Sequence, residues 1–162
     1  MQDTYSLRIA TEGDAALIAE HRGLMFLDMG LASVEEANAL TVATEPWIFD
    51  LLSSGEYKGW ILEEEGIAVT GGGLLLKEMG PVPGCLRVGR SAHIVNVYTV
   101  LAHRKRGLAR RILREMLKWC AENRIDQVTL ASSEEGRGLY ASLGFEPQAE
   151  SMKLERWDRI ES

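Results

Sequence analysis

The strongest chemical signal in the sequence is a basic segment over residues 104–111, Arg-Lys-Arg-Gly-Leu-Ala-Arg-Arg, which holds five of the 18 Lys and Arg residues. It leads into the clearest amphipathic pattern of the chain, which predicts a helix from Arg106 to Asn123. Positive charges are unfavourable at a helix N-terminus because the helix dipole is positive there, so a compensating anion is expected. The unpaired backbone N–H groups of a helix N-terminus bind phosphate, and Gly107 and Ala109 would let a ligand approach the main chain. The segment therefore predicts a phosphate-binding site.

The basic segment has two other interpretations. It could be a solvated basic face in which Arg111 pairs with Glu115 four residues later. It could also contact DNA, but no helix precedes it at the spacing of a helix-turn-helix motif. It is neither a Walker loop, because Gly-Lys-Ser/Thr is missing, nor a G-x-G-x-x-G loop, because Gly107 stands alone. The order of strand, tight basic loop, small residues and helix favours the anion site.

The cysteines and histidines form no motif. Cys120 falls on the apolar stripe of the same predicted helix, and Cys85 lies in a loop rich in Pro and Gly. No pair has metal-ligand spacing, and His21, His93 and His103 are scattered along the chain. We therefore expect neither a metal site nor a covalent enzyme intermediate.

The elements that must position the basic segment follow from hydrophobic periodicity and helix-capping signals. They occur in the order strand, helices, three strands, helix, strand, helix, strand, which predicts an α/β or α+β domain around a central sheet. Ser33 and Glu36 form a capping-box pattern at the start of the second helical region, which Pro46 is expected to interrupt. The strands are expected over 5–10, 57–62, 67–76, 91–100, 128–131 and 145–154, and the helices over 11–26, 33–55, 106–123 and 136–143.

Length and composition fit one ordinary globular domain. The chain has 162 residues, 46% of them hydrophobic, and a formal net charge of −6, which argues against a general nucleic-acid binder. No apolar run reaches the roughly 18 residues that span a bilayer, and the N-terminus lacks the features of a signal peptide. We expect a cytoplasmic protein with no membrane partner, and we leave a homodimer open. Outside residues 104–111, acidic residues outnumber basic ones by 24 to 13, which leaves a surface that could favour a cationic acceptor.

Arg104-x-x-Gly107-x-Ala109 after a Val-rich strand resembles the acyl-CoA signature of the GCN5-related N-acetyltransferase (GNAT) superfamily, Arg/Gln-x-x-Gly-x-Gly/Ala. Residues 139–145, Leu-Tyr-Ala-Ser-Leu-Gly-Phe, are similar to the superfamily's Leu-Tyr-x-x-x-Gly-Phe segment. Asn-Val-Tyr-Thr-Val over 96–100 lies at the usual distance before the signature. The similarity runs from about His93 to Phe145, with Leu101 and Ser133 replacing a frequent Pro and a frequent Asn.

The resemblance implies a single GNAT-like domain over 1–162, with an acceptor-site half over about 1–76 and a CoA-binding half over about 90–154. Its sheet would be mixed and mostly antiparallel, with about six strands flanked by about four helices and splayed between the fourth and fifth strands. A bulge at about Val97 to Thr99 would open this splay. Backbone N–H groups of 106–110 would hold the CoA pyrophosphate, free main-chain groups of Thr99 would pair with the pantetheine arm, and the Val97 N–H would polarise the thioester carbonyl. The implied cofactor-binding residues are Val97, Thr99, Arg104, Lys105, Arg106, Gly107, Leu108, Ala109, Arg110 and Ser133.

The same resemblance implies an N-acetyltransferase that moves an acetyl group from acetyl-CoA to a primary amine within a ternary complex. Tyr140 has the position of the family's general acid, although it could merely pack beside Leu139 and Leu143. His93 has the position where several members carry a base, and its ordinary pKa of about 6.5 suits proton abstraction. A core or rim role for His93, with proton abstraction through water, is the other interpretation.

The acceptor, a small-molecule or peptide amine, should meet the first two helices and the first hairpin. Residues that could line its site are His21, Arg22, Phe26, Met29 and Trp47, and the acidic turn at 63–65 could attract a cation. Two other functions stay open: a non-catalytic acyl-CoA sensor or regulatory domain, and a nucleic-acid module built on the basic helix.

Overall fold

The computed structural model describes residues 3–154. The chain forms two compact units that divide after Ala131. In chain order the elements are β1 (Tyr5–Ile9), η1 (Glu12–Asp14), α1 (Ala15–Asp28), α2 (Val34–Ser54), β2 (Tyr57–Glu64), β3 (Ile67–Met79), β4 (Gly89–Thr99), η2 (Leu101–His103), α3 (Leu108–Glu122), β5 (Gln127–Leu130) and α4 (Arg137–Ser142).

The first unit is built on one sheet with the strand order β1-β2-β3-β4-β5. Neighbouring strands from β1 to β4 pair antiparallel, and β4 pairs parallel with β5. The helix α3 connects β4 to β5, as a parallel pair requires. The predicted α+β domain with a mixed, mostly antiparallel sheet is confirmed, with five strands in the described residues where about six were expected.

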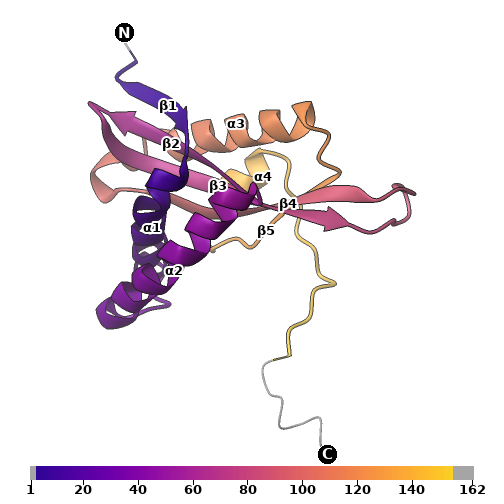
Figure 1. The fold of residues 1–162 in the computed structure, drawn as a ribbon, viewed down its shortest axis with the longest axis horizontal. Helices are drawn as coiled ribbons and strands as arrows, with labels where there is room; N and C mark the ends of the chain where they lie inside the picture. Colours follow the sequence, from indigo (N-terminus) through magenta and orange to yellow (C-terminus); the bar gives the residue numbers. More distant parts are fainter. Residues whose placement is uncertain (1–2, 155–162) are drawn as a thin grey trace, which may run out of the picture. The chain divides into compact units, whose positions relative to one another are not determined.

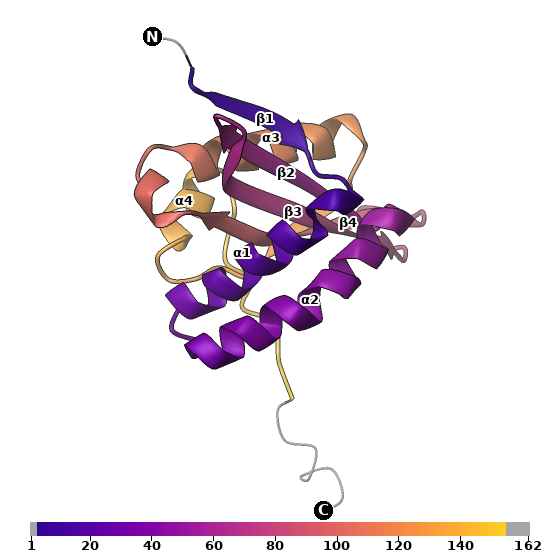
Figure 2. The ribbon, with the colours of Figure 1, turned by 60° about the vertical axis from the view of Figure 1, so that its left-hand side comes forward.

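The helices cover the two faces of this sheet. Figure 1 and Figure 2 show α1 and α2 side by side on one face and α3 on the other. Ile18, Ile48 and Ile61 are buried beneath α1 and α2, while Ile112 and Met116 anchor α3. Full burial of each such side chain stabilises the fold by about 1.5–3 kcal/mol, so apolar packing holds the helices on both faces of the sheet.

The second helix starts where its capping box predicts but continues through Pro46. The Glu36 N–H donates to Ser33 Oγ at 3.1 Å, and the Ser33 N–H donates to the Glu36 carboxylate at 3.1 Å. The predicted interruption at Pro46 is wrong, because α2 runs from Val34 to Ser54. Proline removes one helical hydrogen bond, and the buried Thr44 and Ile48 on either side of it keep both halves packed on the core.

The predicted hairpin is confirmed, and the predicted last strand is not. The strands β2 and β3 meet in a tight turn at Glu65 and Gly66, which have φ angles of 52° and 79°. Residues 145–154 are irregular in the structure. Pro147 can donate no ladder hydrogen bond and Met152 is fully exposed, so this segment gains little from a strand conformation. Within the described part of the chain, no helix is long and apolar enough to cross a membrane.

Candidate active site

A bulge in β4 forms the centre of the candidate site. The register between β3 and β4 shifts so that Asn96 and Val97 together face Gly72, and Asn96 takes a left-handed φ of 59°. Pairing with β5 ends at Ile94, so within the described residues no strand covers positions 95–99 on that side. The predicted splay between the fourth and fifth strands is therefore present, and the predicted bulge begins at Asn96.

The N-terminus of α3 forms a backbone cradle directly after the basic loop. Lys105 and Gly107 both have positive φ angles, 61° and 75°, which turn the chain sharply into the helix. The Arg111 N–H donates to the Gly107 carbonyl at 3.0 Å, so Leu108 and Ala109 lie in the first turn, where N–H groups lack an intrahelical acceptor. A Cβ on Gly107 would meet nothing within 4 Å. This open, donor-rich helix end fits a phosphate group.

The side chains of the basic loop are largely engaged by other parts of the protein. Arg104 forms an ion pair with Asp28, which raises the pKa of Arg104. Its Nε also donates to the Thr99 carbonyl at 2.9 Å. That carbonyl was expected to be free, and it is not. Arg111 pairs with Asp3 at 2.7 Å and not with Glu115, and Arg106 donates to the Tyr5 hydroxyl at 2.9 Å. The loop therefore carries less uncompensated charge than its sequence suggests.

His93 lies on β4 three residues before the bulge. Its Nδ1 is 2.8 Å from Thr129 Oγ1 on the neighbouring β5. Partial burial lowers the pKa of His93, and the charge of Lys77 lowers it further. The imidazole is therefore neutral at pH 7, as a proton acceptor must be.

Three of the five predicted acceptor-site residues come together on α1 and α2. The Arg22 guanidinium lies over the rings of Phe26 and Trp47, 5.1 and 5.5 Å from their centroids. His21 is buried instead against the Tyr98 ring, at 5.0 Å between centroids, and burial lowers the pKa of His21. Met29 is partly exposed at the end of α1 and makes no such contact with the described residues.

Two residues that sequence reasoning missed complete this cluster. The buried Asn96 accepts a hydrogen bond from Arg22 Nη1 at 2.8 Å and donates to the Tyr57 hydroxyl at 3.3 Å. Burial raises the pKa of Tyr57 to about 12, so its phenol stays protonated. A polar Asn within an apolar strand and the Gly-Gly-Gly run at 71–73 were the signals that could have revealed this site.

The acidic turn is engaged by side chains of the chain itself. Glu63 pairs with Arg8 at 2.6 Å, and Glu64 lies 2.8 Å from His103 Nε2, a contact that lowers the pKa of Glu64. Glu63 and Glu64 are therefore not free to attract a cation, as the sequence suggested they could be. Among residues 3–154, no three His, Cys, Asp or Glu side chains are placed to hold a metal ion.

The second unit carries Ser133 and Tyr140. Tyr140 lies on the helix α4, which was predicted from the sequence, and Ser133 lies just before this helix. The Gly136 N–H donates to Ser133 Oγ at 3.1 Å at the start of this helix. The ring of Tyr140 meets Phe145 edge-on at 6.1 Å, and the Phe145 N–H donates to the Tyr140 carbonyl at 3.1 Å. Burial raises the pKa of the Tyr140 phenol, which keeps it protonated at neutral pH.

Comparison with known proteins places these features in context. The family profile for the acetyltransferase (GNAT) domain matches residues 28–157. The chain is similar to the solved structure of a GCN5-related N-acetyltransferase from Ralstonia eutropha JMP134, with 29% identity and a TM-score of 0.84 over 93% of this chain and 97% of that one.

Two further solved structures share the fold at lower identity. A predicted acetyltransferase from Clostridium acetobutylicum, solved with acetyl-CoA, is 24% identical with a TM-score of 0.82 over 93% of this chain and 96% of that one. The glucosamine-6-phosphate N-acetyltransferase of Arabidopsis thaliana is 18% identical with a TM-score of 0.65 over 96% of this chain and 99% of that one. No curated protein sequence matches the chain significantly.

Proposed function

The chain belongs to the GNAT acetyltransferase family, and we propose that it moves an acetyl group from acetyl-CoA to the primary amine of a small-molecule or peptide acceptor. The observation that carries this proposal is the bulge at Asn96 and Val97, with the unpaired edge of β4 that follows it. An open strand edge can hydrogen-bond an extended ligand as a further strand would. The acetyl-CoA bound to the Clostridium acetobutylicum protein of the same fold supports this choice of donor.

We assign cofactor binding mainly to the backbone of the first unit. The N–H groups of Leu108 and Ala109 at the start of α3 would hold the pyrophosphate. The Val97 N–H at the bulge would donate to the thioester oxygen as its negative charge grows. In this proposal Arg104 shapes the loop by binding Asp28 and the Thr99 carbonyl, and its charge contributes less to phosphate binding.

The proposed reaction is direct transfer in a ternary complex. Acetyl-CoA supplies the acetyl group as a thioester; a C–N bond forms, the C–S bond breaks, the amine loses a proton and the thiolate gains one. We assign the proton lost by the amine to His93, directly or through water. Burial lowers the pKa of His93, so its imidazole is neutral at pH 7 and can accept a proton. We assign the proton gained by the thiolate to Tyr140, whose phenol is protonated at neutral pH.

A two-step experiment tests this function. Acetyl-CoA at about 100 times its dissociation constant should stabilise the protein by about 2.7 kcal/mol, measured as a thermal shift. Free-thiol release from acetyl-CoA should then rise above background with at least one member of a panel of amines, amino acids, polyamines and peptides. No shift at millimolar acetyl-CoA contradicts the proposal, and a shift without thiol release for any acceptor favours a non-catalytic acyl-CoA binder.

Tyr140→Phe separates catalysis from binding in the same assay. Removing the phenolic proton donor should lower kcat by about 100-fold or more, because general acid catalysis contributes on that scale. The dissociation constant of acetyl-CoA should change little. Equal turnover in the variant would remove Tyr140 from the mechanism.

A further inference from the structure

Arg22 is a partly buried cation that pairs with no acid in the described part of the chain. Arg8, Arg87, Arg104 and Arg111 each form an ion pair with an aspartate or glutamate. Arg22 forms no ion pair with any acid of residues 3–154, although desolvation lowers its pKa. Removing a charge from water without a counter-ion costs free energy. Binding an anion from outside the chain would offset this cost.

The protein orients the guanidinium of Arg22 and leaves some of its N–H donors without an acceptor among the described residues. Its Nη1 donates to Asn96 Oδ1 at 2.8 Å, and Asn96 is fixed in turn by the buried Tyr57 hydroxyl at 3.3 Å. The rings of Phe26 and Trp47 pack against the guanidinium. Within residues 3–154, no hydrogen bond engages Arg22 Nε or Nη2, and Trp47 keeps 40% of its surface exposed. The group is therefore oriented by the protein and still able to bind a ligand.

The position of this guanidinium connects it to the proposed reaction centre. Its partner Asn96 is the first residue of the β4 bulge and directly precedes Val97, the residue whose N–H is assigned to the thioester. A group bound to Arg22 would therefore lie on the α1 and α2 side of the bulge. That side is the acceptor half of the proposed site.

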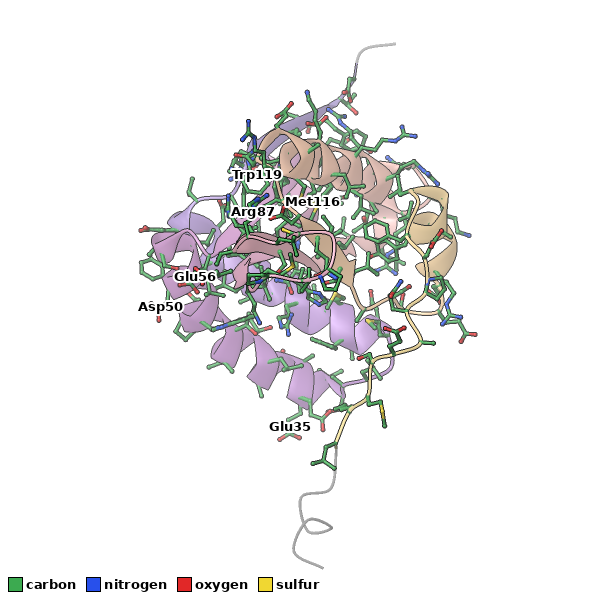
Figure 3. All side chains as sticks on the ribbon, turned by 90° about the vertical axis from the view of Figure 1, so that its right-hand side faces the viewer. Glu35, Asp50, Glu56, Arg87, Met116 and Trp119 are labelled. Carbon is green, nitrogen blue, oxygen red and sulfur yellow. The ribbon has the colours of Figure 1, made fainter. Side chains whose placement is uncertain are left out.

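The charges of α1 and α2 indicate which anion fits. Arg22 is the only Lys or Arg on these two helices, which together carry six Asp and Glu residues. Figure 3 shows two of these acids, Glu35 and Asp50, projecting from α2 away from the sheet. A single guanidinium fork in acidic surroundings suits the planar monoanion of a carboxylate, whereas a phosphate dianion would meet more repulsion and only one cation.

We propose that Arg22 binds a carboxylate on the acceptor, so that the substrate is an amine that also carries a carboxylate, as amino acids and peptides with a free C-terminus do. This inference rests on the proposed acetyl transfer and adds the acceptor class to it. It also revises the expectation that the acidic remainder of the surface favours a cationic acceptor, because the cation that faces the acceptor belongs to the protein.

Matched acceptor pairs test the proposal on the unmodified protein. Free-thiol release is measured with amino acids and their amides, with dipeptides bearing free or amidated C-termini, and with phosphoethanolamine beside β-alanine. Each free acid should exceed its amide by about 10- to 100-fold in kcat/KM, the range expected for hydrogen bonds to a charged group. Equal values for acids and amides would overturn the proposal, and so would a preference for phosphoethanolamine over β-alanine.

Variants then assign the preference to Arg22. Arg22→Met should abolish the difference between acid and amide, and Arg22→Lys should restore part of it because it keeps the charge without the planar fork. Both should retain their acetyl-CoA dissociation constant, and Arg22→Met should melt at a lower temperature because the buried Asn96 carbonyl loses its donor. The control Arg87→Met removes the same charge from an exposed arginine on the β3–β4 connection (Figure 3), and it should keep the full acid preference.

The results separate this inference from the proposed function. A preference for acids that survives Arg22→Met would overturn the assignment even where acetyl transfer is robust. If Arg22→Met does not fold, the acid and amide pairs on the unmodified protein still decide the substrate class. Absence of thiol release with every amine would instead contradict acetyl transfer itself.

Discussion

Asn96 shows how the backbone conformation of one residue decides which side chains meet. Val95 packs on the core beneath α1 and α2, so strict alternation along β4 would point Asn96 to the opposite face. The left-handed φ of Asn96 at the bulge turns its side chain to the same face, where it reaches Arg22 and Tyr57. Sequence periodicity alone could not have predicted this cluster, because the bulge interrupts the period.

At His93, the pKa direction gives a test of the proposed base. The pKa lies below its ordinary value of 6.5 because the side chain is partly buried. As pH falls through this lowered pKa, the imidazole gains a proton and can no longer accept one, so kcat/KM should show an added loss below pH 6.5. A pH–rate profile of the enzyme and of His93→Ala should show this loss only in the former.

The titration of the acceptor amine also lowers the rate in acid, so a control is needed for this profile. His103→Gln removes a different histidine, which lies against Glu64, and should keep the acidic limb. An identical limb in His93→Ala would show that His93 is not the base and that the proton leaves by another route.

At the scale of elements, the glycine run of β3 lets three layers approach one another. A Cβ at Gly72 would lie 3.1 Å from Ile112 and 3.3 Å from Met116 of α3. A Cβ at Gly73 would overlap the Tyr57 hydroxyl on the other face. The bulge and its hydrogen-bonded cluster therefore depend on missing side chains in the neighbouring strand.

Gly73→Ala should consequently destabilise the protein by about 1–3 kcal/mol, the usual cost of overpacking a core. Tyr57 must move to admit the methyl group, so its hydrogen bond to Asn96 should be lost as well. Urea unfolding measures the change. The control Gly80→Ala, where a Cβ meets nothing within 4 Å, should change stability by less than about 1 kcal/mol, and equal midpoints for both variants would contradict this account.

At the scale of the whole molecule, charge is distributed unevenly. The net charge is −6, yet five cations lie within residues 104–111, and three of the arginines there bind groups on β4 and in the first 28 residues. Long-range repulsion from the acidic remainder opposes a polyanionic ligand, while local attraction at the loop favours it. The local attraction acts at shorter distance and so should dominate the binding.

Salt should therefore weaken acetyl-CoA binding. Raising NaCl from about 0.05 to about 0.5 M shortens the Debye length and screens the loop cations, so the dissociation constant measured by calorimetry should rise. Dephospho-CoA, which lacks one phosphate, should show a shallower dependence than CoA. Equal slopes would mean that backbone donors alone hold the phosphates.

The features that could be predicted from the amino-acid sequence are those that depend on neighbouring residues. The amphipathic helix after the basic loop, the Ser33–Glu36 cap and the β2–β3 hairpin each depend on residues only a few positions apart, and the structure confirms them. The GNAT signature lies within one such strand–loop–helix passage, so the family could be inferred from it.

Contacts between residues far apart in the sequence could be seen only in the folded protein. Asn96 contacts Arg22, 74 positions away in the sequence, and Tyr57, 39 positions away. Arg104 forms an ion pair with Asp28, and Arg111 forms one with Asp3. These contacts follow from strand register, the bulge and the packing of helices on the sheet, none of which leaves a periodic trace in the sequence. The helix end that we propose to hold the pyrophosphate was therefore predictable from local pattern, whereas the contacts of the proposed acceptor site required the fold.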